Sequence, residues 1–347
     1  MIRHRSANRV WRPLGRAILV CPRSLLVTLV LLLISAGLVL VSLSIGRVDV
    51  GLWQLLQILS GAGDGDLTER VVVGIRLPRG LTAVFVGAAL GVSGAVFQSV
   101  SRNALGSPDI IGFTTGAATG AIAQIVFFGQ QAAGVMLAAV AGGLLTSVLV
   151  YFLAVQGRVV GSYRLVLVGI GIGSILSAVN GLLLVKGSLD NAVTANLWLA
   201  GSLSARNWGH LLPVLAGCLV LIPMTLLFAR QLHLMEMGDD LAAQLGIRVE
   251  RIRLLMVIFA VLLAALATGA AGPIAFIALA APQLVRRLLP AGSLPVMAAA
   301  AMGACLLVFA DVLTQMLPVE AALPIGRMTG VVGGLYLLWL LSRTRSI

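Results

Sequence analysis

Residues 231–253, QLHLMEMGDDLAAQLGIRVERIR, form a dense block of charge between two long apolar segments, 210–229 and 252–271. An apolar segment of about 20 residues is long enough to cross the hydrocarbon core of a bilayer as a helix. A block as polar as 231–253 must then lie in water between two membrane spans. The stretch therefore predicts an all-α membrane protein with a structured loop on one side of the bilayer.

Within this loop the sequence predicts a short helix that a glycine ends. We expect Asp239 to cap its N-terminus by accepting free backbone N–H groups, with Asp240 adding charge to the first turn. The apolar positions are expected on one stripe. Such a short helix is not stable alone in water, so it is either one turn of a solvated loop or a coupling helix that docks in a groove on a cytoplasmic partner. The candidate coupling residues are Asp239, Asp240, Leu241, Ala242, Leu245 and Gly246.

The composition places the whole chain in the membrane class. Of its 347 residues, 59% are hydrophobic and only 10% are charged, and the mean hydropathy is +1.06. Soluble domains carry roughly 25% charged residues. The net charge of +12 does not indicate nucleic acid, because the basic residues sit mainly at the ends of apolar segments, as the positive-inside rule describes.

The apolar segments predict about ten spans within a single transmembrane domain at 25–347, preceded by a basic cytoplasmic tail at 1–24. Placing the N-terminus inside puts most of the 24 Lys and Arg residues on the cytoplasmic side, which is the favoured orientation. Both termini, and the coupling helices near 238–248, are then cytoplasmic. The predicted spans are 25–45, 75–100, 109–128, 133–155, 164–185, 210–229, 252–271, 274–289, 294–315 and 326–341.

The sequence contains no P-loop, no H-E-x-x-H, no paired Cys-x-x-Cys and no serine elbow. We therefore expect a chain that is not an enzyme and binds no cofactor or metal. Asp311 is the clear ionisable group within a predicted span, and a structural hydrogen-bonding role is favoured over an ion path. Asp109 follows Pro108 at the start of another span and is expected to be an N-cap.

The segment Arg76-Leu77-Pro78-Arg79 lies at the predicted outer mouth. Two arginines beside a Leu-Pro kink offer forked donors for carboxylates. Contact with phospholipid headgroups is an equally physical explanation, and the residues alone leave both open.

Taken in order, several motifs resemble those of the FecCD-type permeases, the membrane subunits of ABC importers for ferric siderophores, haem and cobalamin. The similarity covers nearly the whole chain after the tail, and the segment 272–287, with its Ala-Pro-Gln, resembles ferric-enterobactin permeases in particular. The motifs are Arg76-Leu77-Pro78-Arg79, Gly87-Ala88-Ala89-Leu90-Gly91-Val92-Ser93-Gly94, Arg102-Asn103-Ala104-Leu105-Gly106-Ser107-Pro108, Trp198-Leu199-Ala200-Gly201-Ser202, Leu245-Gly246-Ile247, Ala281-Pro282-Gln283 and Leu323-Pro324-Ile325-Gly326.

The resemblance implies a type II ABC importer permease of about ten helices in a bacterial inner or plasma membrane. Its implied partners are a second permease subunit, with a heterodimer favoured, two cytoplasmic ATPase subunits that hold ATP and magnesium, and an extracytoplasmic binding protein that delivers a ferric siderophore. The short helix would then lie in the ATPase cleft. A cobalamin or haem importer remains the alternative within the class, and an ion-coupled secondary carrier the alternative outside it.

The resemblance also implies roles for residues at both ends of the spans. Arg76 and Arg79 would receive acidic residues of the binding protein, and Arg327, where relatives carry an apolar residue, is expected to supply a third outer cation. Relatives often carry a docking arginine shortly after the position of Asp311, where Gln315 stands here. The inner loop that holds Gly161, Ser162 and Tyr163 resembles the position of a cytoplasmic gate.

Overall fold

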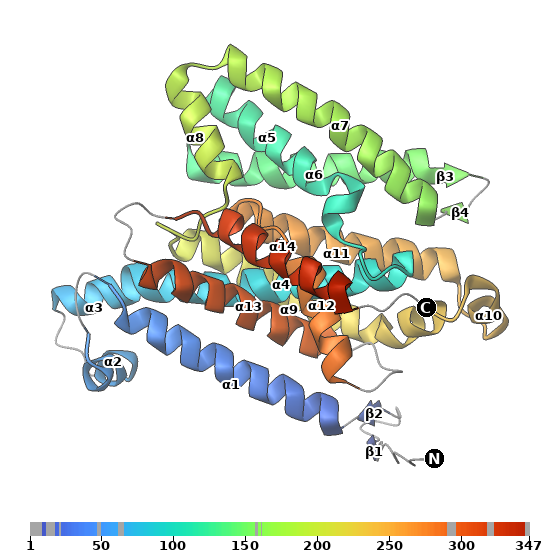
Figure 1. Ribbon diagram of the computed structural model, residues 1–347, viewed down its shortest axis with the longest axis horizontal. Coiled ribbons are helices and arrows are strands. Elements are labelled where there is room, and N and C mark those ends of the chain that lie inside the picture. The colour runs from blue at the N-terminus through green and yellow to red at the C-terminus, as the bar shows by residue number, and fades with distance from the viewer. Residues whose placement is uncertain are drawn as a thin grey trace.

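The computed structural model describes residues 9–11, 18–20, 22–46, 50–61, 66–156, 159–160, 162–289, 296–317 and 323–343, and these are almost entirely helical (Figure 1). The long helices are α1 Pro22–Ser44, α4 Leu77–Ser101, α6 Ala132–Ala154, α7 Ser162–Lys186, α9 Trp208–Met235, α11 Val249–Ala271, α13 Val296–Met316 and α14 Ile325–Arg343. The shorter helices are α2 Leu52–Leu59, α3 Leu67–Val71, α5 Phe113–Phe128, α8 Leu189–Leu199, α10 Asp239–Gln244 and α12 Ile277–Leu288, with a π-helix η2 Val72–Arg76 and a 3-10 helix η3 Pro108–Ile111. Two small antiparallel pairs join β1 Arg9–Trp11 to β2 Ile18–Val20 and β3 Val155–Gln156 to β4 Val159–Val160.

The predicted all-helical membrane architecture is confirmed, and the chain is a multi-pass membrane protein. Among the described residues, seven helices are long and apolar enough to cross a membrane: α1, the continuous α3–η2–α4 unit, α6, α7, α9, α11 and α13. The three other predicted spans coincide with α5, α12 and α14. Of these, α5 has 16 residues and α12 only 12, so the structure by itself does not show ten full spans.

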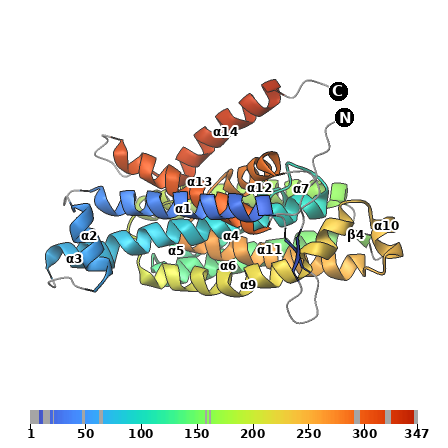
Figure 2. The same cartoon turned by 90° about the horizontal axis from the view of Figure 1, so that it is seen from below.

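Helix α4 is the centre of the packing. It contacts α13, α11, α9 and α12, while α5, α6 and α7 form a second layer beside it (Figure 1). Helix α10 lies at one end of the molecule, together with the start of α1 and the end of α14, and α2, α3 and α8 lie at the opposite end (Figure 1). Figure 2 shows α14 tilted away from the other helices along most of its length.

The close approach of α4 to its neighbours depends on glycines at helical spacing. A Cβ atom added at Gly87 would lie 2.3 Å from the carbonyl oxygen of Gly303 in α13, and one added at Gly94 would lie 1.7 Å from the carbonyl oxygen of Ala278 in α12. Small residues allow membrane helices to pack backbone against backbone, where apolar association gives no help. The glycine-rich motif 87–94 is therefore a packing surface.

We expect the substitution Gly94→Ala to destabilise the protein by about 3 kcal/mol, because the new methyl group overlaps a backbone oxygen that cannot rotate away. The matched control is Gly37→Ala in α1, where an added Cβ meets nothing within 4 Å. The measurement is the yield of monodisperse protein after heating in detergent. Equal yields for the two variants would contradict this account of α4.

Two helices begin inside the molecule instead of at its ends. Helix α11 stops at Gly272, whose φ of +75° suits glycine, and an extended segment leads back to α12, which starts after Phe276 at φ +69°. Similarly, α5 starts after η3 and Gly112, with φ +70°. The first turns of both helices, at Thr114 and Ala278, line one small cavity with Leu90, which is near the middle of α4. Both half-helices therefore begin at about the mid-depth of the membrane.

Candidate functional site

The end of the protein that was predicted to be cytoplasmic, called the inner end below, presents α10 to solvent (Figure 1). Leu241 is 50% exposed and Leu245 is 64% exposed, so two apolar side chains one helical turn apart lie uncovered. Ala242, however, is fully buried against the protein, so only Leu241 and Leu245 of the predicted stripe are open to a partner. Packing of α10 against α9 and α11 fixes which face turns inward, and local spacing does not contain that information.

The predicted cap at Asp239 is also wrong. Gly238 is the N-cap residue of α10, and no side chain caps this terminus. The Asp239 carboxylate instead lies 2.8 Å from the Arg253 guanidinium of α11 and 3.4 Å from that of Arg102 at the end of α4. The prediction for the other end is confirmed: Gly246 adopts φ +82° directly after the helix, which lets the chain turn there.

A second ion-pair group lies beside the first. One Glu236 carboxylate oxygen accepts a hydrogen bond from Ser99 of α4 at 2.6 Å and another from Arg286 of α12 at 2.8 Å. Its other oxygen is 3.1 Å from the His233 ring. The Arg253 side chain, only 4% exposed, also pairs with Glu250.

These contacts join Asp239 of α10 to α11 and to the end of α4, and they join Glu236, in the turn between α9 and α10, to α4 and α12. Ion pairs at a surface are individually weak, but the nearly buried Arg253 and the shared carboxylates make a network in which the groups are held in one geometry. The turn that holds Glu236 and the start of α10 therefore contacts three helices, α4, α11 and α12, and all three line the small cavity beside Asp109.

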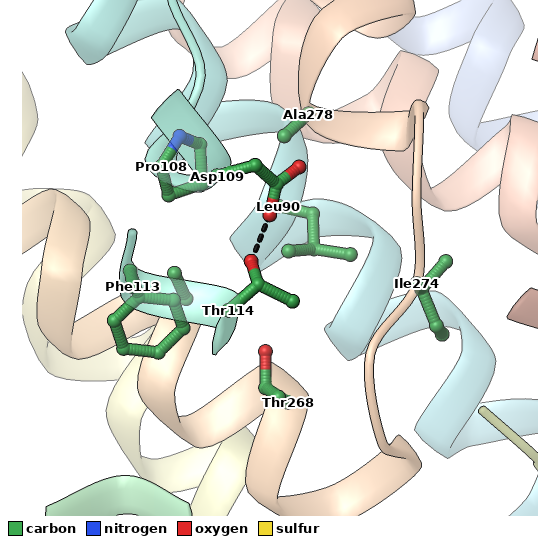
Figure 3. Close-up of a pocket in the computed structure, with 9 residues that line it drawn as sticks. Leu90, Pro108, Asp109, Phe113, Thr114, Thr268, Ile274 and Ala278 are labelled. Atoms are coloured by element: carbon green, nitrogen blue, oxygen red, sulfur yellow. Dashed lines mark hydrogen bonds between the residues drawn. The ribbon is translucent and has the colours of Figure 1, made fainter. Parts of the chain in front are cut away.

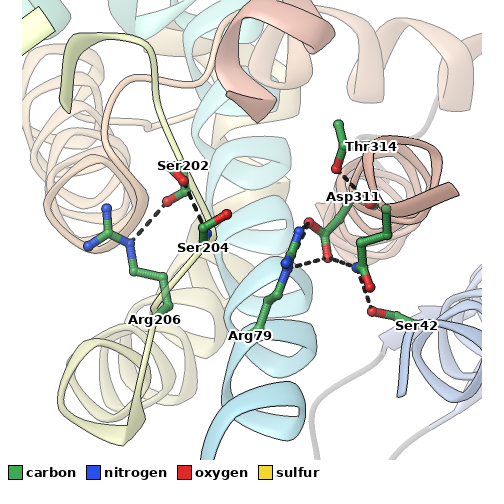
Figure 4. Close-up of polar contacts among 8 residues, drawn as sticks. Ser42, Arg79, Ser202, Ser204, Arg206, Asp311 and Thr314 are labelled. Atoms are coloured by element: carbon green, nitrogen blue, oxygen red, sulfur yellow. Dashed lines mark hydrogen bonds and ion pairs between the residues drawn. The ribbon is translucent and has the colours of Figure 1, made fainter. Parts of the chain in front are cut away.

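The opposite end, which was predicted to face outward and is called the outer end below, holds a buried ion pair between α4 and α13 (Figure 4). Arg79 donates to both carboxylate oxygens of Asp311, with the shortest contact at 2.8 Å. Asp311 is 1% exposed and the Arg79 side chain 25% exposed. Gln315 joins the group, since its amide donates at 2.8 Å both to Asp311 and to Ser42 of α1. Asp311 therefore has the structural role that was favoured from sequence. The positive charge of Arg79 is paired with the Asp311 carboxylate.

The other two outer arginines differ in their surroundings. Arg76 donates to the Leu43 carbonyl oxygen at 2.7 Å and lines, with Arg79, an open cavity of about 440 Å³ beside α1. Arg327 is exposed in the first turn of α14. The structure thus brings Arg76 and Arg79 together and places Arg327 on a different helix.

A further arginine, which the sequence did not single out, lies in the loop before α9 (Figure 4). Arg206 donates to the Ser202 carbonyl oxygen at 3.0 Å and lies 3.3 Å from the His210 ring. Burial lowers the pKa of Arg206 from its ordinary value, although a guanidinium stays protonated in proteins. Its contacts are local, and they hold the loop 202–207 in shape.

At mid-depth, Asp109 occupies η3 and does not cap a helix, so this prediction too is wrong. Its carboxylate accepts a hydrogen bond from the Thr114 hydroxyl in the first turn of α5 (Figure 3). Asp109 borders a cavity of about 10 Å³, which has room for about one water molecule, and an open groove of about 260 Å³. The predicted span began at Asp109, whereas α5 begins at Phe113, after η3 and the positive φ of Gly112.

The predicted gate residues are only partly visible. Gly161 lies outside the described residues, Ser162 begins α7, and Tyr163 is 77% exposed in its first turn. Within the described ranges, no group of three or more His, Cys, Asp or Glu residues is arranged to hold a metal ion.

Comparison with known proteins gives consistent matches along the chain. The sequence model of the FecCD transport family matches residues 29–343. The ferric enterobactin transport system permease protein FepG of Escherichia coli is 45% identical over 321 residues, covering 92% of this chain and 96% of the relative. The hemin transport system permease protein HmuU of Yersinia pestis is 35% identical over 314 residues, covering 88% and 93%.

A solved structure has the same arrangement of helices. It is described as an inward-facing conformation of a metal-chelate type ABC transporter, and it matches with a TM-score of 0.81 and 27% sequence identity. The match covers 92% of this chain and 99% of the other.

Proposed function

This chain belongs to the FecCD transport family, and from that premise we propose that it is the permease subunit of an ABC importer for a ferric siderophore of the catecholate, enterobactin-like type. The observation that carries the proposal is the 45% identity to a ferric enterobactin permease over 92% of the chain. The chain is a transport subunit and not an enzyme, and its partner ATPase subunits hold ATP and magnesium.

In the proposed assembly, each end of the molecule contacts a different partner. Ten spans result if α5, α12 and α14 are added to the seven long helices, as in a type II importer. Both termini are then cytoplasmic, α10 docks on the ATPase, and the outer arginines face the binding protein. A second permease subunit completes the path, because a large chelate needs a passage between two subunits. We favour a second subunit that differs from this chain.

The proposed mechanism is alternating access driven from outside this chain. The loaded binding protein docks on the outer face, and closure of the ATPase dimer around ATP moves α10. The ion pairs of Asp239 and Glu236 carry that movement into α4, α11 and α12. The half-helices at mid-depth then change position relative to the path.

We expect Arg327→Ala to slow association of the binding protein roughly 3- to 10-fold at low salt, because a rim charge acts chiefly on the rate of encounter. The variant Arg327→Lys keeps the charge and should associate at the wild-type rate. The measurement is surface-based binding kinetics on the complex in nanodiscs at two salt concentrations. If Arg327→Ala associates normally at low salt, Arg327 is not the third outer cation.

The experiment that tests the ligand is uptake into proteoliposomes containing both permeases and the ATPase, with the binding protein outside. Ferric enterobactin, haemin and cobalamin are compared for ligand-stimulated ATP hydrolysis and import. We expect stimulation by ferric enterobactin. Stimulation by haemin alone would favour the haem alternative, which the 35% identity to a hemin permease supports. Import that continues without ATP and stops when the proton gradient is removed would favour an ion-coupled carrier.

A further inference from the structure

Asp109 places a carboxyl group at the mid-depth of the membrane, on an open side of the subunit. It shares a cavity with Leu90, near the middle of α4, and with Ala264 of α11. Asp109 is an exposed residue, and it borders a groove with Leu105, Ser107, Ala275, Phe276 and Leu279. A charged group at this depth does not face lipid, because that costs several kcal/mol; it faces protein or a water-filled path.

No cation among the described residues neutralises this group. The ion pairs of Asp311, Asp239, Glu236 and Glu250 lie at the two ends of the helices, and none of them includes Asp109. The carboxylate instead accepts a hydrogen bond from the Thr114 hydroxyl. Its other carboxylate oxygen lies on the side of Ala278 (Figure 3).

The positive groups that do surround Asp109 are two helix ends. The first turn of α5 contributes Phe113 and Thr114 to the cavity, and the first turn of α12 contributes Ala278. A helix N-terminus has a positive potential equivalent to roughly half an elementary charge. Two such ends together supply roughly one positive charge, and the Asp109 carboxylate offsets it.

This balance matters for an anionic cargo. A ferric tris-catecholate carries a net negative charge, whereas a ferric trihydroxamate such as ferrichrome is neutral. Two uncompensated helix ends at mid-depth would hold the anion, and a conducting path must bind its cargo weakly enough to release it.

We infer that Asp109 is a specificity-determining residue of the transport path, whose carboxylate cancels the positive potential of the α5 and α12 N-termini so that an anionic chelate passes without being retained. The inference rests on the proposed function, since it assumes that the cargo moves along this groove. The sequence position alone would have given Asp109 no role beyond a cap.

The test compares wild type with Asp109→Asn, which keeps the shape and removes the charge, and with Asp109→Glu, which keeps the charge. Binding of ferric enterobactin and of ferrichrome, each labelled with radioactive iron, is measured on the whole complex in nanodiscs without the binding protein. We expect Asp109→Asn to retain ferric enterobactin roughly 3- to 30-fold more tightly than wild type. Ferrichrome binding should be unchanged, and Asp109→Glu should resemble wild type.

A control variant distinguishes loss of the Asp109 charge from a local change in structure. Thr114→Val removes the hydrogen bond but leaves the charge, and it should not distinguish the two chelates. If Asp109→Asn changes both chelates equally, or changes neither, the inference is overturned. Because binding is measured without import, these outcomes are independent of whether the wild-type complex imports ferric enterobactin, which is the separate test of the proposed function.

Discussion

Replacing both Leu241 and Leu245 by glutamate should abolish ATP-driven uptake while the protein still folds and inserts. The two side chains are the uncovered apolar face of α10, 50% and 64% exposed. Apolar side chains at the centre of a docking site contribute about 2 kcal/mol or more each, and charge in their place leaves carboxylates unpaired in the contact. We therefore expect uptake to fall at least ~100-fold, measured with labelled chelate in proteoliposomes.

The matched control replaces the same two leucines by methionine, which keeps the apolar face and its approximate volume. This variant should retain most of the uptake and should co-purify with the ATPase. The glutamate variant should elute as a folded membrane protein but without the ATPase. If it keeps both the ATPase and normal uptake, α10 is not the docking element.

The substitution Asp311→Ala is expected to cost about 3–5 kcal/mol of stability, the usual result of leaving a buried charge without its partner. Asp311 is 1% exposed, and it joins Arg79 of α4 to Gln315 of α13, which itself bonds Ser42 of α1. Removing the carboxylate therefore loosens three helices at the outer end. The measurement is the unfolding of the purified chain in mild detergent on titration with a denaturing detergent.

A double variant distinguishes the effect of the Arg79–Asp311 ion pair on stability from the effect of Arg79 on docking of the binding protein. Arg79→Met combined with Asp311→Leu removes both charges and keeps apolar volume, and replacement of a buried pair in this way is often neutral. We expect the double variant to recover most of the stability lost in Asp311→Ala while it still docks the binding protein poorly. A cost below about 1 kcal/mol for Asp311→Ala would show that the pair is not a structural tie.

The elements that the sequence predicts well are those with a local signal. Helix α10 begins at Asp239 and is followed by Gly246, as the two flanking glycines indicate. The long apolar runs coincide with α1, α6, α7, α9 and α13, since each run is both long enough and apolar enough to span.

The details that the sequence misses depend on partners distant in the chain. Arg79 and Asp311 are 232 positions apart, so neither local spacing nor propensity relates them. The local sequence predicts that Asp239 is a helix cap, and it contains no sign of the ion pair with Arg253 of α11. The half-helices α5 and α12 were predicted as ordinary spans, because hydropathy does not record where inside the membrane a helix begins.

Helix α4 connects the two ends of the proposed mechanism. At its outer end Arg79 holds α13, and at its inner end Ser99 and Arg102 contact Glu236 and Asp239. Its middle lies against the cavity beside Asp109. One helix thus contacts the outer end, the proposed path and the turn that holds the proposed coupling helix, and we propose that movement passes through it.

The central claim is that a separate ATPase acts through α10 to drive this chain. The most direct measurement is uptake of ferric enterobactin by proteoliposomes holding both permeases and the ATPase, loaded with ATP or with a non-hydrolysable analogue, with and without a proton gradient. The account predicts uptake with ATP alone, none with the analogue, and loss of uptake when Leu241 and Leu245 are replaced by glutamate. Uptake that follows the proton gradient and proceeds without ATP would contradict it.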